Sequence, residues 1–148
     1  MPAPKDPGKA EFYVYRLVAD GVPFYVGIGR SARASDRVRY IRYLVSREAS
    51  GKPVKWNVHT RTIFALLRTG CDIQVQYSAR DLTRAQALVK ERTEIADLLS
   101  VGYTLLNIQH NPQRPKTAEQ VIEPVLLRAR TLAMRSGRAK QGAQADGP

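Results

Sequence analysis

Residues 12–30, FYVYRLVADGVPFYVGIGR, contain two runs of aromatic and β-branched residues separated by a turn dipeptide. Residues 12–18 and 22–28 each favour a β-strand. The intervening Asp20-Gly21 is typical of a tight hairpin turn. Pro23 has no backbone N–H to donate, which indicates that the second strand lies at a sheet edge or begins there. The stretch therefore predicts a β-hairpin.

Downstream of the hairpin, the spacing of apolar residues predicts helices and one further strand. Helices are expected over residues 34–49 and 54–67. A third helix of about 17 residues should follow a capping box at Thr83–Gln86. A fourth is expected over residues 118–134, with Pro124 tilting or splitting it. Residues 71–77 alternate as a strand does, and residues 103–108 form either a short return strand or an extended segment. We expect an α+β domain with a small, mainly antiparallel three-stranded sheet flanked by helices, and an additional C-terminal helix.

Proline, glycine and charge mark the expected boundaries within the chain. Residues 1–10 carry prolines and lysines and predict a flexible N-terminus, while Asn111-Pro112 marks a break. We expect a domain over residues 11–111, a helical extension over 112–135 and a disordered basic tail over 136–148.

The size and cysteine content bound the protein class. A chain of 148 residues is long enough for one domain with its own core. Its single cysteine, Cys71, excludes an internal disulfide and fits a reducing compartment, so a cytoplasmic (prokaryotic or phage-like) or otherwise intracellular location is expected. No apolar run is long enough to span a bilayer, which predicts no membrane partner.

Positive charge is concentrated in one segment. The formal charge is +11, and residues 28–68 hold ten Lys and Arg residues against two acidic ones. Such a segment offers a footprint to a polyanion, with nucleic acid as the first expectation and a ribosome-like or anionic-membrane partner as the alternatives. Charge alone says nothing about catalysis.

The hairpin also carries two tyrosine motifs. Tyr13-Val14-Tyr15 lies on the first strand and Tyr25-Val26-Gly27 on the second. Together they resemble the two-part signature of the GIY-YIG nucleases, in the subgroup whose second motif continues as Gly-x-Gly. Arg33, Glu91 and Asn107 follow in the order of that family's arginine, glutamate and asparagine. The resemblance spans Phe12 to Asn107, about two-thirds of the chain.

The resemblance implies a metal-dependent endonuclease that hydrolyses phosphodiester bonds of double-stranded or branched DNA. It implies Mg²⁺ (or Mn²⁺) at Glu91 and catalytic roles for Tyr15, Tyr25 and Arg33. One tyrosine would orient or deprotonate the attacking water, and Arg33 would stabilise charge on the phosphate. Gly27 would allow a close backbone approach, and Asn107 would brace the backbone near Glu91.

The position of Glu91 points to a cation independently of the family. It lies three residues after Leu88 and four before Ile95, on the side of the apolar stripe. Burying an unpaired carboxylate there would cost several kcal/mol. Glu91 therefore requires a metal or an arginine, and the alternative is an ordinary ion pair with Arg84 or Arg92. Glu94 is expected to face solvent.

The sequence departs from the family at three positions. Tyr13 stands where glycine is frequent, Ile28 replaces a lysine that Arg30 could substitute, and Arg37 stands where histidine or tyrosine is frequent. Arginine stays protonated, so Arg37 removes one candidate for proton transfer, and Tyr40 could substitute. Arg30, Arg37 and Tyr40 are candidate phosphate contacts. These departures keep two alternatives open: a catalytically degraded GIY-YIG-like DNA-binding module and a basic RNA-binding domain.

The remaining features carry weaker expectations. His59 is expected to be structural because its neighbours are apolar, whereas His110 could come near the cleft. The last helix could be a second DNA contact, a homodimer helix or a solubilising end. Val121, Val125 and Leu126 are expected to close the domain's own core.

Overall fold

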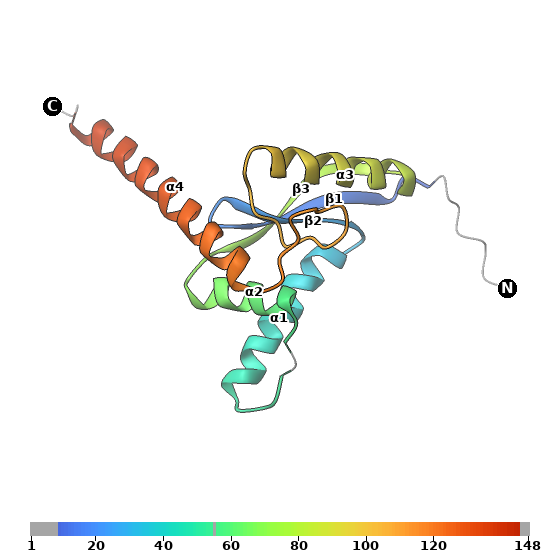
Figure 1. Ribbon diagram of the computed structural model, residues 1–148, viewed down its shortest axis with the longest axis horizontal. Helices are drawn as coiled ribbons and strands as arrows, with labels where there is room; N and C mark the ends of the chain where they lie inside the picture. Colours follow the sequence, from blue (N-terminus) through green and yellow to red (C-terminus); the bar gives the residue numbers. More distant parts are fainter. Residues whose placement is uncertain (1–8, 55, 146–148) are drawn as a thin grey trace.

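The computed structural model describes residues 9–54 and 56–145, so most of the N-terminus expected to be flexible, residues 1–8, lies outside the described residues. Three strands and four helices form an α+β domain, which confirms the expected fold class (Figure 1). In chain order they are β1 Phe12–Ala19, β2 Val22–Arg30, α1 Arg33–Ala49, α2 Val58–Arg68, β3 Ile73–Leu82, α3 Arg84–Ser100 and α4 Glu119–Ala145.

The sheet is antiparallel, with the strand order β2-β1-β3. The predicted hairpin is confirmed: β1 and β2 are joined at Asp20 and Gly21, whose φ angles of 47° and 86° both lie in the left-handed region. β2 is an edge strand, and Pro23 stands opposite Val18. A register shift lies next to this pair, where an irregular ladder tolerates a residue without a backbone N–H. β3 continues to Leu82, five residues beyond the predicted end, because its pairing follows β1 along its length.

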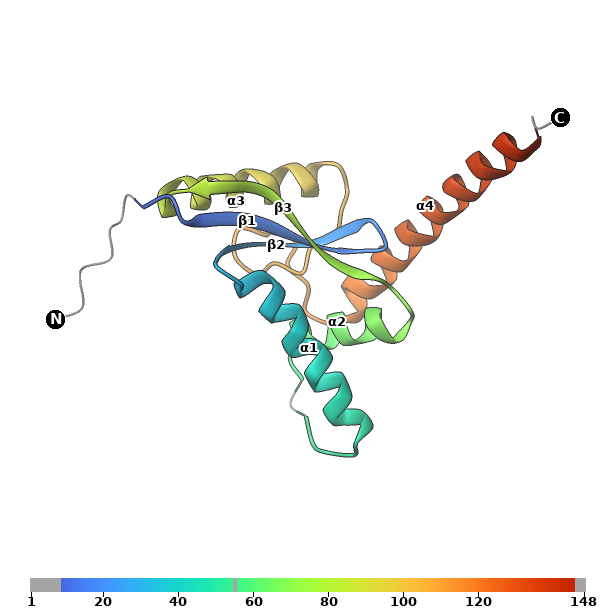
Figure 2. The same ribbon diagram turned by 180° about the vertical axis from the view of Figure 1, so that it is seen from behind.

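Helices cover both faces of the sheet. α3 lies over one face, while α1 and α2 lie on the other, as two opposite views show (Figures 1 and 2). The larger core, on the α1 and α2 side, includes Leu17, Phe24 and Ile63. Val121 and Val125 of α4 are buried in the same core, as expected from their spacing. The smaller core packs the fully buried Val14, Val26 and Ile95 beneath α3.

Residues 103–108 form the extended segment and not the return strand. The backbone N–H of Leu106 donates to the carbonyl of Phe24 at 2.7 Å. The side chain of Asn107 accepts from the N–H of Val26 at 3.0 Å and donates to its carbonyl at 2.7 Å. An asparagine amide therefore satisfies the free edge of β2 in the way that a paired strand would.

Two helix boundaries differ from the predictions by more than one residue. α2 begins at Val58, four residues late, because Asn57 and Thr60 form a capping box that fixes its first turn. α4 continues to Ala145, past Ser136, where we expected a disordered tail. Alanine, lysine and glutamine in this stretch favour a helix and offset its two glycines. Residues 146–148 of the expected tail lie outside the described residues. None of the described helices has the length and apolar character needed to cross a membrane.

Candidate active site

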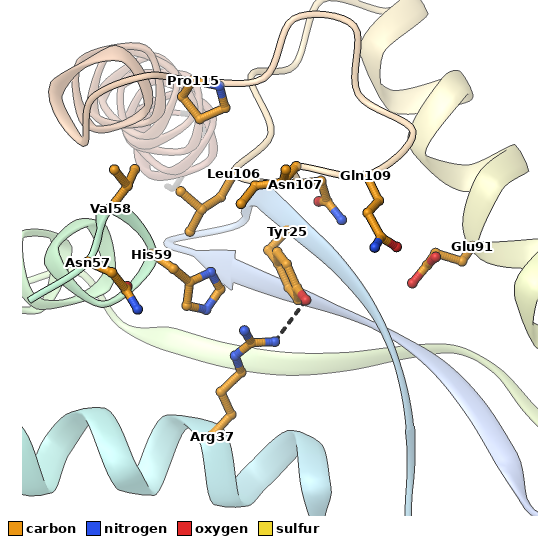
Figure 3. A pocket seen from close by; sticks show the side chains of 11 residues that line it. Tyr25, Arg37, Asn57, Val58, His59, Glu91, Leu106, Asn107, Gln109 and Pro115 are labelled. Atoms are coloured by element: carbon orange, nitrogen blue, oxygen red, sulfur yellow. Dashed lines mark hydrogen bonds between the residues drawn. The ribbon is translucent and has the colours of Figure 1, made fainter.

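Two adjoining pockets form a cleft between α1, α3 and the segment after α3. Tyr25, Glu91 and Gln109 line both of them. The inner pocket, of about 620 Å³, adds Arg37, His59 and Asn107, and the outer pocket adds Arg30, Arg33 and Arg84. Figure 3 shows the side chains of Tyr25, Arg37, His59, Gln109 and Glu91 converging from four elements and a loop. Of the residues that the sequence predicted for the site, the fold thus gathers all but Gly27, Tyr15 and Tyr40 on the cleft walls.

Tyrosine rings of β1 lie directly over glycines of β2. Tyr15 is paired with Gly27 and Tyr13 with Gly29 across the hairpin. A Cβ atom at Gly27 would stand 2.6 Å from Cζ of Tyr15, and one at Gly29 would stand 2.8 Å from Cε2 of Tyr13. Gly27 therefore permits a close approach, and the group that approaches its backbone is the Tyr15 ring.

Tyr13 anchors the start of α1. Its hydroxyl accepts a hydrogen bond from the backbone N–H of Ala34 at 3.1 Å and donates to the carbonyl of Ser31 at 2.9 Å. Ser31 has a φ of 53°, a left-handed conformation in which the backbone turns from β2 into the helix. The tyrosine at the position where the family often has glycine thus fixes the helix that carries Arg33 and Arg37.

The hydroxyls of Tyr15 and Tyr25 meet at Arg37. Its Nη1 donates to the Tyr25 hydroxyl at 2.8 Å and lies 3.3 Å from the Tyr15 hydroxyl. The guanidinium also stacks over the Tyr25 ring, 4.6 Å from its centroid. Arg33, the predicted catalytic arginine, is exposed at the outer pocket, because it is the first residue of α1 and lies one turn nearer the helix end. Arg37 is therefore the arginine that contacts both tyrosines.

The two tyrosines differ in access to the cleft. Tyr15 is 1% exposed, and its burial, with a contribution from neighbouring Tyr25, raises its pKa despite the opposing charges of Arg37 and Arg33. A phenol whose pKa lies above its usual value stays protonated at neutral pH, which weakens the expectation that Tyr15 deprotonates water. Tyr25 is half-buried and lines both pockets, so it is the tyrosine that a substrate can reach.

Glu91 is a half-buried carboxylate on the cleft wall. Among the described residues it takes part in no ion pair, so neither Arg84 nor Arg92 neutralises it. Burial raises its pKa, and the nearby charge of His110 partly offsets that effect. His110 itself lines neither of the two pockets. A carboxylate held in this way gains from a cation on its open side.

The expectation for Glu94 was wrong. Glu94 is 2% exposed, and its carboxylate pairs with Arg16 of β1 and accepts from the Ser78 hydroxyl of β3 at 2.7 Å. Leu88, which we had placed in the apolar stripe, is 45% exposed. The inner face of α3 is centred on Ala87 and not on Leu88, a rotation that brings Glu94 onto the sheet and leaves Glu91 at the cleft.

His59 is the site residue that sequence reasoning missed. It lines the inner pocket, and its ring packs edge-on against Tyr25 at 4.9 Å. Its Nε2 is buried and has no hydrogen-bond partner among the described residues. Burial, reinforced by the charge of Arg37, lowers its pKa to about 3, so the imidazole is neutral at physiological pH. The capping box at Asn57 could have indicated that His59 stands in the first turn of α2, but no signal in the sequence places that turn beside the cleft.

The other candidate contacts divide into two groups. Arg30 lines the outer pocket and is held by Glu11 at 3.0 Å. Tyr40 lines neither pocket and stacks on Tyr43, an arrangement that gives no support to the proton-transfer role suggested for it. Asn107 braces the backbone of β2 at Val26 and lines the pocket that Glu91 also lines.

The donor set of the cleft restricts the metals it could hold. In the part of the chain that the structure describes, no three His, Cys, Asp or Glu side chains cluster. Glu91 would be the carboxylate ligand, with the Gln109 side chain on the same walls. One carboxylate fits Mg²⁺, which keeps several waters and takes oxygens from a bound phosphate. It does not fit zinc, which needs three or four protein ligands.

Comparison with known proteins found no match for this chain among protein-family models, curated proteins or solved structures. The assignment of a function therefore rests on the cleft itself.

Proposed function

We propose that the protein is a metal-dependent endonuclease of the GIY-YIG type that hydrolyses phosphodiester bonds in DNA. One observation carries the proposal: a half-buried carboxylate without an ion-pair partner among the described residues, Glu91, shares a cleft with a tyrosine hydroxyl held by an arginine. Basic side chains line the outer part of the same cleft, where a phosphate backbone would enter.

Glu91 would hold Mg²⁺ or Mn²⁺. Burial raises the pKa of this carboxyl, so binding a cation relieves a cost that the folded protein otherwise bears. When bound, the metal neutralises charge on the phosphate and on the leaving oxygen.

Tyr25 would orient the attacking water or a phosphate oxygen. Arg37 donates to its hydroxyl oxygen, which leaves the hydroxyl hydrogen of Tyr25 free to point into the cleft. Arg37 thereby fixes the direction of that hydrogen, while Tyr15 behind it stays protonated and fills the base of the site. Preorganised donors of this kind contribute most when water is partly excluded.

Arg33 would contact the substrate phosphate from the outer pocket. It is exposed, stays charged, and is free to swing toward an incoming anion. Its role is therefore charge stabilisation, as the family resemblance implied, whereas Arg37 organises the tyrosines.

DNA is the substrate class that the charge favours. Residues 28–68, which include β2's end, α1 and α2, hold ten basic residues against two acidic ones. A duplex or branched DNA would bring its phosphates to this segment, and binding should weaken steeply with added salt.

A supercoiled-plasmid assay tests the proposal. Wild type should nick or linearise the plasmid with Mg²⁺ or Mn²⁺, and EDTA should abolish the reaction. Glu91→Ala and Arg33→Ala should each lose activity by about 100-fold or more, while Leu127→Ala, at a residue 65% exposed on α4, should retain it. Metal-independent cleavage, or cleavage by Glu91→Ala at the wild-type rate, would refute the assignment.

A non-catalytic DNA-binding module is the second candidate. It is favoured by Arg37, a residue that cannot exchange protons, standing where the family often has histidine or tyrosine. This alternative predicts salt-sensitive DNA binding that Glu91→Ala leaves unchanged, without cleavage under any metal condition.

A further inference from the structure

α1 carries a row of aromatic and basic side chains on its exposed side, which we call the α1 ridge. Tyr40 and Tyr43 are each 55% exposed, and their rings stack with centroids 6.3 Å apart and an interplanar angle of 29°. Nη1 of Arg47 reaches the Tyr43 hydroxyl at 3.4 Å. The ridge consists of Arg33, Arg39, Tyr40, Tyr43 and Arg47.

The ridge is continuous with the cleft. Tyr40 follows Arg37 by three residues and Arg33 by seven, so these side chains lie along one line of the helix. From Arg33 to Arg47 the line extends roughly 21 Å, at 1.5 Å per residue. Arg33 opens it at the outer pocket, and the far end of α1 projects away from the sheet (Figure 2). A DNA strand that leaves the cleft would pass along the α1 ridge.

The burial pattern shows that the two rings do not serve the core. The inner side of α1 is formed by Ala34, Val38, Ile41 and Leu44, all buried. Tyr40 and Tyr43 lie beyond that face, where a solvated helix ordinarily carries charged residues. The two rings stack on each other, yet each stays 55% exposed, so a ligand or partner can still contact them.

We propose that the α1 ridge is a stacking platform for unpaired bases of the DNA strand that runs through the cleft. Charge complementarity favours this occupant: α1 holds five arginines against Asp36 and Glu48, and one of those acids is engaged by Arg39 at 3.6 Å. Arginines along the row would bind phosphates while the tyrosines stack on bases.

Unpaired bases fit the ridge better than a duplex does. In a duplex each base face is covered by its neighbours, so a helix could contact only phosphates and base edges and could not stack on the bases. Stacking on exposed tyrosines requires bases that are splayed from their partners, as at a fork, a flap or a single-stranded gap. The site would therefore favour DNA with a junction between paired and unpaired segments. The choice of DNA over RNA rests on the proposed function.

Fluorescence anisotropy without divalent metal, in EDTA, tests the ridge separately from cleavage. The probes are a labelled single-stranded oligonucleotide, the blunt duplex of the same sequence, a forked duplex with splayed ends and the corresponding RNA strand. Wild type is compared with Tyr40→Ala/Tyr43→Ala, with the matched Tyr40→Phe/Tyr43→Phe variant that keeps both rings, and with Leu127→Ala. Thermal unfolding confirms that each variant is folded.

We expect the alanine pair to weaken binding of the single strand and the fork by about tenfold or more, and binding of the blunt duplex by less than about twofold. The phenylalanine pair and Leu127→Ala should bind as wild type does. An equal loss on all probes, a loss restricted to RNA, or no loss at all would overturn the proposal. Because no metal is present, the platform can fail while cleavage survives, and it can hold in a protein that does not cleave.

Discussion

Glu94 and Glu91 lie one turn apart on α3, yet their removal should have opposite effects on stability. Glu94→Ala would leave the Arg16 guanidinium without its carboxylate partner and would remove one of the two acceptors of the Ser78 hydroxyl, the other being the carbonyl of Val14. Breaking a buried ion pair by deleting one partner costs about 3–5 kcal/mol. The Arg16 side chain keeps 32% of its surface exposed, so water can solvate it in part, and we expect about 3 kcal/mol.

For a chain of this length, 1 kcal/mol shifts the melting temperature by roughly 2–4 °C, so Glu94→Ala should melt about 6–12 °C lower than wild type. Differential scanning calorimetry, with urea unfolding as a second measure, gives the shift. The double variant Arg16→Ala/Glu94→Ala should recover part of the loss because it leaves no buried charge behind. A melting temperature within about 2 °C of wild type for Glu94→Ala would refute the argument that this network pins α3 to the sheet.

Three further outcomes follow from the same geometry. Glu91→Gln should melt at a higher temperature than wild type at pH 8, because burial raises the pKa of Glu91 and its ionised form therefore costs stability above that pKa. The difference in melting temperature should vanish as the pH falls below the ordinary value of 4.5. Calorimetry at a series of pH values checks this prediction. Mg²⁺ should raise the melting temperature of wild type but not of Glu91→Gln, in a thermal-shift titration. Gly27→Ala should lower the free energy of unfolding by about 1–3 kcal/mol in urea, because the new Cβ would stand 2.6 Å from the buried Tyr15 ring; unchanged stability would contradict that packing.

Local signals in the sequence were sufficient for much of the fold. The hairpin was predictable because Asp20-Gly21 accepts left-handed backbone angles and the flanking runs favour strands. The capping box at Thr83 fixed the start of α3, since it is a contact between residues three apart. Such features depend on neighbours in the chain and need no tertiary structure.

The details of the site depend on contacts between distant residues. Arg37 and Arg33 differ by one helical turn, and only the packing of α1 on the sheet decides which one reaches Tyr25. Glu94 could not be predicted as buried because its partners, Arg16 and Ser78, are 78 and 16 residues away in the sequence. Glu91 and Glu94 lie only about 60° apart around the helix axis, so a small rotation of α3 decides which of them faces the sheet.

His59 shows the same limit in a different way. A histidine among apolar residues is equally consistent with a core position and with a cleft wall, and its sequence neighbours do not distinguish them. The structure places it against Tyr25, an aromatic contact across 34 positions of the chain.

The rate of DNA cleavage as a function of Mg²⁺ concentration tests the central claim most directly. A labelled forked duplex is incubated under single-turnover conditions with wild type and with Glu91→Gln, which removes the charge but keeps the side-chain shape. We predict that wild type shows a rate that rises with Mg²⁺ and saturates, and that Glu91→Gln shows no measurable cleavage at any concentration. The same rate and the same Mg²⁺ dependence in both proteins would contradict the assignment of Glu91 as the metal ligand of a nuclease.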